Sequence, residues 1–325
     1  MPRSNEPIPV HGLPTQGEEA EMSAFIVFGS PERRCLGAAM QMREHSIGSS
    51  FVLRITDEEN AERAQHIQEL RGILERFGDV KDCPTSHADP LAGIQAVVQE
   101  VSALVEASTR AGITLDISTF PKNSLLLMLR ALDQWGLTKY LRLVYTEPAD
   151  YKQSLDEPLS YGIKGVKIVP TFSAPYKPQE ELCLIVFLGY ERDRALGLVE
   201  SIQPHRTIGV IARPAYRPEW EGRSEQINAA LLASLDSSDI FYVDSRNPLH
   251  SHRLLERLAV SESVAGPNLY ISPLGTKPQT IGIYSFVRKH RTFASVVYAA
   301  PIAHSHQYIT EGLGPTWILP SVEID

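Results

Sequence analysis

The sequence predicts an α/β protein made of two tandem, internally duplicated, Rossmann-like parallel-sheet units. Two observations carry this prediction. The tripeptide Ile-Val-Phe is followed by a Glu-Arg pair twice, from Ile26 and from Ile185, which are 159 positions apart (185 − 26 = 159). Each half also alternates charge-poor apolar runs with amphipathic stretches of helical period. This alternation is typical of a parallel sheet that is covered by helices on both faces.

Further matches between the halves support the duplication. The stretch from Ile113, ITLDISTFPKNS, aligns with the stretch from Asn268, NLYISPLGTKPQ. A Val-Tyr-x-x-Pro pattern occurs at Tyr145 and again at Tyr298, with an offset of 153 (298 − 145 = 153). Several short matches in the same order and at a nearly constant offset indicate an internal repeat.

The expected elements follow the same order in both halves. The predicted strands of the first half are 24–28, 51–55, 113–117 and 141–145, and those of the second half are 182–188, 207–211, 268–272 and 295–298. Amphipathic patterns predict helices over 58–76 and 224–235. A further strand over 166–169 is expected to close the first sheet, and the segment 311–320 is expected to repeat this arrangement in the second.

These elements divide the chain into two units and their connections. We expect a disordered tail over 1–21, a first Rossmann-like unit over 22–170, a linker over 171–181 and a second unit over 182–325. The first residues carry four prolines and no apolar run of the kind that a signal peptide needs. The two copies and the tail account for the chain, so no third domain is expected.

Composition limits the function. The chain has 325 residues, 43% of them hydrophobic, with a net charge of −8, and such an acidic protein lacks the basic face that extended nucleic acid requires. The longest apolar run has seven residues, far fewer than the roughly 20 that cross a bilayer. The cysteines, Cys35, Cys83 and Cys183, are odd in number and form no CxxC motif. They predict a reduced, cytoplasmic protein without disulfides or a zinc site.

The strongest candidate for a binding site is the stretch SPLGTKPQ, which follows a predicted strand and precedes a predicted helix. Thr276 suits the N-cap of that helix, Pro278 suits its first turn, Gly275 lets a ligand approach the backbone, and Lys277 supplies a cation. Such a helix start can cradle a phosphate. The alternative is a well-capped helix with a solvated lysine.

The first half contains a related stretch, STFPKNS. Here Ser118 or Thr119 is the expected cap and Lys122 the expected cation, with Pro121 before it, but the glycine is missing. A ligand should therefore approach this backbone less closely. The same alternative, a capped helix start without a ligand, applies.

The turn after the first strand of each half is the second candidate. In the first half this turn contains Ser30, Glu32 and Arg33, and in the second half it contains Gly189, Glu191 and Arg192. The arginines are suited to bidentate phosphate binding, and the glutamates to contacts with a ribose or base. The alternative is surface decoration, because Glu in a first helical turn is favourable for the helix dipole alone.

Other residues fit packing or loop roles better. A metal site at His304 and His306 would need a third ligand, which among acidic residues only Glu311 could supply, so an ordinary loop that includes Tyr308 is the expected reading. Tyr145, Tyr298, Trp220 and Trp317 are expected to pack rather than to stack on bases. The sequence has no GxxxxGK[ST], GxGxxG, HExxH or GxSxG motif, and no metal or cofactor is predicted.

The Gly275-Thr276-Lys277 tripeptide between a strand and a helix resembles the motif of CRISPR-associated Rossmann-fold (CARF) domains, which bind cyclic oligoadenylate messengers. Two such units in one chain also resemble SAVED domains. The resemblance implies that the loops GSPER and GYERD complete the pocket, with Lys122 and Lys277 on opposite sides of a pseudo-symmetric ligand. Phe120-Pro121-Lys122 departs from the motif in the first half.

Three functions follow from these residues. The first is a sensor of nucleotides, with cyclic oligonucleotide messengers as one candidate ligand class, in prokaryotic antiviral defence or stress, acting on a separate effector protein. The second is a metal-independent, ring-nuclease-like enzyme acting on nucleotides or other phosphorylated small molecules, in which Lys277, Thr276 and Glu191 stabilise charge at phosphorus. The third is an interaction subunit of a defence complex that binds no ligand.

Overall fold

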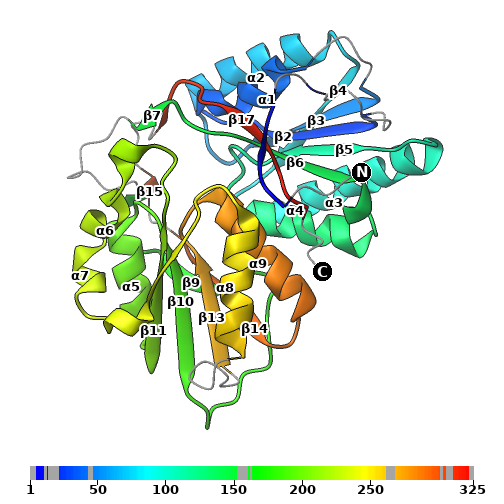
Figure 1. Ribbon diagram of the computed structural model, residues 1–325. Helices are drawn as coiled ribbons and strands as arrows, with labels where there is room; N and C mark the ends of the chain where they lie inside the picture. The colour runs from blue at the N-terminus through cyan, green and yellow to red at the C-terminus, as the bar shows by residue number, and fades with distance from the viewer. Residues whose placement is uncertain are drawn as a thin grey trace. The chain divides into compact units, whose positions relative to one another are not determined.

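The fold is described from a computed structural model of the chain. The structure describes residues 5–10, 13, 22–42, 47–151, 160–161, 163–260, 268–300, 303–304 and 310–321. Two compact units make up the protein (Figure 1). The first contains Met1–Lys152 and Tyr308–Glu323, and the second contains Gln153–Gln307.

The first unit is built on a sheet of seven strands in the order β1-β17-β6-β5-β2-β3-β4. Five of them run parallel, and β17 and β1 extend the sheet beyond β6 in antiparallel fashion. The strands are β1 (Ile8–Pro9), β2 (Ala24–Phe28), β3 (Ser49–Ile55), β4 (Asp79–Thr85), β5 (Ile113–Asp116), β6 (Leu141–Thr146) and β17 (Thr316–Leu319). A separate pair joins β7 (Asp150–Tyr151) to β16 (Thr310–Glu311).

Helices cover both faces of this sheet. One face carries η1 (Arg33–Leu36), α1 (Gly37–Met40) and α2 (Ala61–Leu74), and the other carries α3 (Pro90–Ala107) and α4 (Lys122–Gln134), with η2 (Thr138–Tyr140) before β6. On the first face, Phe25 and Val27 pack against Leu36, Leu70 and neighbouring side chains in one buried cluster.

The second unit is built on a sheet of six strands in the order β12-β11-β10-β13-β14-β9. Its parallel strands are β10 (Leu182–Leu188), β11 (Arg206–Ala212), β12 (Ile240–Val243), β13 (Asn268–Pro273) and β14 (Ala294–Ala300), and β9 (Gly165–Ile168) is antiparallel. A separate pair joins β8 (Ser160–Tyr161) to β15 (Ala303–His304).

Helices again form two layers. One contains α5 (Arg192–Ile202), α6 (Arg223–Ile227) and α7 (Ala229–Leu232), and the other contains α8 (Pro248–Ala259) and α9 (Lys277–Lys289). Short 3-10 turns, η3 (Pro218–Trp220) and η4 (Ser237–Asp239), precede α6 and β12. In the part of the chain that the structure describes, none of the helices has the length and apolarity needed to cross a membrane.

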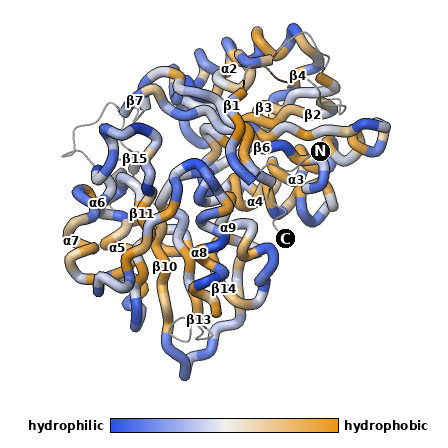
Figure 2. The backbone as a smooth tube through the Cα atoms, viewed as in Figure 1, coloured by the Kyte–Doolittle hydropathy of each residue, from blue (hydrophilic) through white to orange (hydrophobic). Residues whose placement is uncertain are grey.

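The predicted α/β class with two parallel-sheet units is confirmed. In chain order within each unit, the parallel strands of both sheets lie in the sequence 3-2-1-4-5, which is the Rossmann arrangement. The central strands β2 and β10 are buried along their whole length, and Figure 2 shows their apolar composition. The absence of charge in these strands follows from burial on both faces.

The start of the third helix is duplicated as well. Asp89 caps α3 by accepting a hydrogen bond from the amide of Leu91 at 3.1 Å, and Asn247 caps α8 through the amide of Leu249 at 3.0 Å. A proline follows each cap in the first helical turn. This repeated Asx-Pro-Leu sequence adds to the evidence for duplication.

The closing strands lie in sheets other than those expected. The segment around Val166 pairs with β14 of the second sheet and does not close the first, while β17 pairs with β6 of the first sheet. The strand that follows the first copy, β9, therefore completes the second sheet, and the strand that follows the second copy, β17, extends the first. An edge strand joins a sheet through backbone hydrogen bonds, so its side-chain pattern does not specify which sheet it extends.

The expected disordered tail also differs in part. Ile8 and Pro9 pair with β17, Leu13 forms a bridge with Met42, and Leu13 is fully buried. Proline is compatible with this place because β1 lies at the edge of its sheet. The other residues of 1–21 lie mostly outside the described part of the chain.

Truncation after residue 309 tests the strand exchange. It removes β16 and β17, so we expect the amides of β6 to lose hydrogen-exchange protection while those of β14, still paired with β9, keep theirs. Mass spectrometry of peptides over 141–146 and 294–300 makes the measurement. Loss of protection in β14 instead would show that each copy keeps its own closing strand.

Candidate functional site

The strand order brings the two predicted loops of each half together. In each sheet the first strand lies between the second and the fourth, so the connections leave in opposite directions at β2 and β5, and at β10 and β13. Ligands of open α/β sheets bind at this switch point, outside the carboxyl ends of the strands. We call the two places the first edge (residues 29–34 and 116–122) and the second edge (residues 189–194 and 272–279).

Glycines permit close backbone packing at the second edge. A Cβ atom on Gly189 would lie 2.3 Å from the carbonyl oxygen of Leu274, and one on Gly275 would lie 2.2 Å from Oε1 of Gln279. Neither position has room for a side chain. The turn after β10 and the start of α9 therefore touch through their backbones.

Thr276 caps α9, as predicted. Its Oγ1 accepts a hydrogen bond from the amide of Gln279 at 3.3 Å, and Oε1 of Gln279 accepts one from the amide of Thr276 at 2.8 Å, which together form a capping box. The Thr276 hydroxyl also donates to the carbonyl of Ser245 at 2.8 Å, which ties the loop after β12 to this helix start. Lys277 is the first helical residue and is half-buried, and Pro278 follows it.

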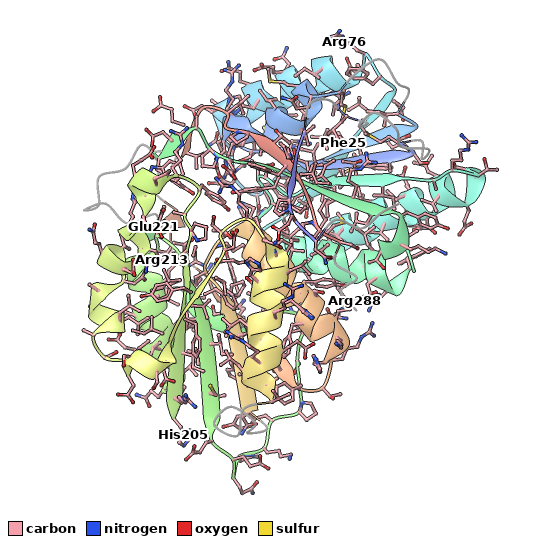
Figure 3. All side chains as sticks on the ribbon, viewed as in Figure 1. Phe25, Arg76, His205, Arg213, Glu221 and Arg288 are labelled. Atoms are coloured by element: carbon pink, nitrogen blue, oxygen red, sulfur yellow. The ribbon has the colours of Figure 1, made fainter. Side chains whose placement is uncertain are left out.

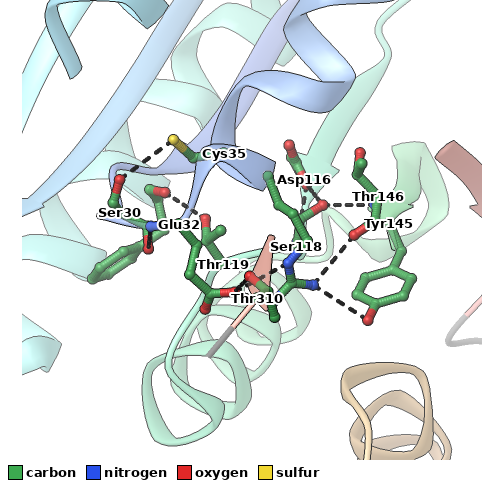
Figure 4. A network of polar contacts seen from close by, with 11 residues as sticks. Ser30, Glu32, Cys35, Asp116, Ser118, Thr119, Tyr145, Thr146 and Thr310 are labelled. Carbon is green, nitrogen blue, oxygen red and sulfur yellow. Dashed lines mark hydrogen bonds and ion pairs between the residues drawn. The ribbon is translucent and has the colours of Figure 1, made fainter. Parts of the chain in front are cut away.

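The first edge is constructed differently, and the predicted cap at Ser118 or Thr119 is wrong. Pro121 is the N-cap of α4 and makes no side-chain cap bond, while Lys122 is the first helical residue. The Ser118 hydroxyl accepts from the amide of Thr146 at 2.8 Å and donates to Asp116 (Figure 4). The Ser118 hydroxyl therefore bonds to residues at the ends of β5 and β6 and does not cap the helix.

Thr119 and Ser30 join the same network. Thr119 donates its hydroxyl to the carbonyl of Phe28 at 2.6 Å and thereby links the loop after β5 to the end of β2. The Ser30 hydroxyl accepts from the amide of Glu32 at 3.1 Å, and the Ser30 carbonyl lies 3.2 Å from Nδ1 of His66. Both residues are buried, so the polar groups of the first edge serve mainly one another.

The Glu-Arg motif of the first half forms a buried ion pair through the second arginine. The Arg34 guanidinium contacts the Glu32 carboxylate at 2.6 Å, the Thr146 carbonyl at 3.3 Å and the Tyr145 hydroxyl at 3.4 Å (Figure 4). Thr310 donates a hydrogen bond to the same carboxylate. Burial opposes the charge of Arg34, but Glu32 and Tyr145 outweigh it, so the pKa of Arg34 is raised and the guanidinium stays charged.

The second half repeats this ion pair. Arg194 pairs with Glu191, donates to the carbonyl of Ala299 at 2.6 Å, and lies 5.1 Å from the ring centroid of Tyr298. Ala299 follows Tyr298 just as Thr146 follows Tyr145, so the contacts correspond. In both units a buried arginine clamps the start of the first helix to the end of the last parallel strand.

The arginines predicted to bind phosphate are therefore not the ones that the fold positions. Arg33 is 53% exposed and lies 3.5 Å from Glu69, away from the network of the first edge. The side chain of Arg192 lies outside the described part of the chain. An alignment of the two halves on their Glu-Arg dipeptides matches Arg33 to Arg192. In the structure, Arg34 is instead equivalent to Arg194. The two arginines are out of register because the Glu-Arg dipeptide leads into a 3-10 helix in the first unit and into an α-helix in the second.

An arginine and an aromatic ring lie together at the second edge, and a second such pair joins the loop after β11 to β12; neither pair was predicted from the sequence. The guanidinium of Arg223 lies 5.0 Å from the ring centroid of Tyr190, directly after Gly189. Arg213 lies 4.4 Å from the Tyr242 ring and pairs with Glu221 at 2.9 Å (Figure 3). The signal was the loop RPAYRPEWEGR after β11, which stands where the first half has the acidic TDEEN.

The predictions for the histidine loop and for the large aromatic residues have the following outcomes. His306 and Tyr308 and the side chain of His304 lie outside the described residues, and among the residues described no group of three His, Cys, Asp or Glu could hold a metal ion. Tyr145 is buried with its hydroxyl bonded to Arg34, and Trp220 is buried beneath Arg217, both in packing roles as predicted.

The cysteine thiols do not have the properties of nucleophiles. Burial raises the pKa of Cys35 to about 12, that of Cys83 to about 12 and that of Cys183 to about 11. The reactive thiolate is therefore scarce at neutral pH.

Comparison of the sequence with models of known protein families and with curated proteins gives no match. The geometry of the two edges therefore carries the functional argument by itself.

Replacement of the buried arginines tests their structural role. We expect Arg34→Met and Arg194→Met each to lower the free energy of unfolding by about 3 kcal/mol, because a partly buried glutamate loses its partner. Arg33→Met is the matched control and should change it by less than about 0.5 kcal/mol, since its ion pair is exposed. Urea denaturation measures all three, and an equal loss in the control would contradict the assignment.

Proposed function

We propose that this protein senses a nucleotide, with a cyclic oligonucleotide messenger as the leading candidate, in a prokaryotic antiviral defence or stress system. The single observation that supports this function best is the convergence of two glycine-bearing loops at a topological switch point beside the start of α9. The proposed place of action is the cytoplasm, and the proposed target is a separate effector protein.

The start of α9 has the features that phosphate recognition requires. The helix has 13 residues, so its N-terminus carries a substantial positive dipole end, and Lys277 adds a cation at its first position. Gly189 and Gly275 let the turn after β10 pack closely against the start of α9. Arg223 brings a second cation to the neighbouring turn.

A nucleotide suits the second edge better than a simple anion. The ring of Tyr190 and the guanidinium of Arg223 that lies over it offer flat surfaces of the kind that nucleobases stack on. The resemblance of Gly275-Thr276-Lys277 to the CARF motif favours the same ligand class. The acidic net charge argues against extended nucleic acid as the partner.

A thermal-shift titration with AMP, ATP, linear oligoadenylates and cyclic oligoadenylates tests the proposal. At a free concentration about 100-fold above Kd, a ligand adds about 2.7 kcal/mol and should raise the melting temperature by roughly 5–10 °C. Lys277→Ala should weaken binding at least tenfold, because a charge-assisted hydrogen bond contributes about 1.5–3 kcal/mol.

Chromatography of the same samples separates the competing functions. An intact ligand supports a sensor, whereas a cleaved one identifies a nucleotide-processing enzyme. The absence of any shift, with a folded protein, would overturn the proposal and favour an interaction subunit. Lys289→Ala, at the opposite end of α9, is the control and should bind like the unmodified protein.

A further inference from the structure

The second edge gathers buried polar atoms that have no hydrogen-bond partner in the described part of the chain. They are Oγ of Ser245, Oγ of Ser272, Oδ1 of Asn228 and Nε2 of Gln279. Each of these residues is at most 2% exposed. A buried polar atom without a partner costs about 1–3 kcal/mol and is uncommon in native proteins. Four of them around one switch point require an explanation.

Ser272 and Gln279 belong to the second edge, and Asn228 and Ser245 contact its backbone from neighbouring segments. Nδ2 of Asn228 donates to the carbonyl of Gly189 at 2.8 Å, so its amide lies at the turn after β10. Oε1 of Gln279 lies 2.8 Å from the amide nitrogen of Thr276, so Nε2 lies at the start of α9. The carbonyl of Ser245 accepts from the Thr276 hydroxyl. The half-buried Gly189, Thr276 and Lys277 mark where a ligand reaches them.

The first edge carries a different chemical group at the position of Ser272. The strand registers pair Asp116 with Val27 and Ser272 with Val186, and Val27 and Val186 are equivalent in the repeat, so Asp116 corresponds to Ser272. Asp116 is fully buried and binds both the amide and the hydroxyl of Ser118. A carboxylate at this position repels an anion that a neutral serine accepts.

The loops after β3 and β11, the second strand of each unit, also differ in charge. In the first unit, Arg63 is held by Glu58 at 2.7 Å, and Asp57 accepts a hydrogen bond from the amide of His87. In the second unit, arginines take the corresponding place, and Arg223 stacks on Tyr190 at the edge itself. The loop after the second strand is thus acidic in the first unit and rich in arginine in the second, where Arg223 lies at the second edge.

We propose that the second edge alone binds the ligand, so that each chain holds one nucleotide, and this inference rests on the proposed function. The chemistry of the unpartnered atoms defines the ligand further. Nε2 of Gln279 and the ammonium of Lys277 supply hydrogen bonds to phosphate oxygens, and the serine hydroxyls can do the same. Oδ1 of Asn228 only accepts, so it selects a ligand that also carries a hydroxyl or amino donor, as a ribose or an adenine does.

Gln279→Glu is the sharpest test. A glutamate at this position keeps the oxygen that accepts from Thr276, so the capping box and the fold are retained, but it replaces the Nε2 donor by an anionic oxygen. Isothermal titration with AMP and a cyclic tetra-adenylate should give one site per chain for the unmodified protein. The variant should bind at least tenfold more weakly. Because Gln279 is fully buried, a carboxylate in its place also lowers the free energy of unfolding, so circular dichroism is used to show that the variant is folded at the titration temperature.

Lys122→Ala is the matched control at the first edge and should leave affinity and stoichiometry unchanged, whereas Lys277→Ala should weaken binding. Inorganic phosphate should bind far more weakly than AMP, because it offers little to Asn228. Two sites per chain, unchanged binding by Gln279→Glu, or equal losses in the two lysine variants would overturn the inference while leaving the proposed function intact. Failure of every nucleotide to bind the unmodified protein would overturn both.

Discussion

The central position of the first strand is the constraint on which each unit depends. Because β2 pairs with β3 on one side and β5 on the other, and β10 pairs likewise with β11 and β13, the connections diverge at the carboxyl ends of these strands. The divergence brings helix starts and backbone groups of two loops close together. Loops more than 80 residues apart in sequence become neighbours for this reason alone.

The buried arginine of each unit maintains this arrangement from within. The arginine donates hydrogen bonds to a backbone carbonyl at the end of the last parallel strand. The neighbouring glutamate neutralises the arginine's charge, so both the charge and the hydrogen-bonding groups of the guanidinium are used within the protein. A cation committed in this way is not available to a ligand. The cations that remain for binding lie at other positions, which explains why the duplicated Glu-Arg motif is a guide to folding more than to function.

The sequence was sufficient for the fold class, the duplication and the cap at Thr276, because burial periodicity and capping chemistry are local properties. It was insufficient for the closing strands, since the pattern around Val166 suits an edge position in either sheet. It did not identify the arginines that the fold buries, because Arg34 follows its partner Glu32 by two residues whereas Arg194 follows Glu191 by three. The prediction of a cap at Ser118 was wrong because the Ser118 hydroxyl accepts a hydrogen bond from the amide of Thr146 in β6. No local sequence pattern encodes this contact between residues 28 positions apart.

The divergence of the two copies separates what folding requires from what function uses. Positions that hold the backbone are alike in both units, as the buried arginines and the Asx-Pro caps at Asp89 and Asn247 show. Positions at the switch point have changed in chemistry while the backbone around them has not, with a carboxylate at Asp116 and an unpartnered hydroxyl at Ser272. A group that the fold leaves unsatisfied costs stability, and such a cost is commonly found where a protein binds something. The copy with the less satisfied polar groups is for that reason the one to which we assign the ligand.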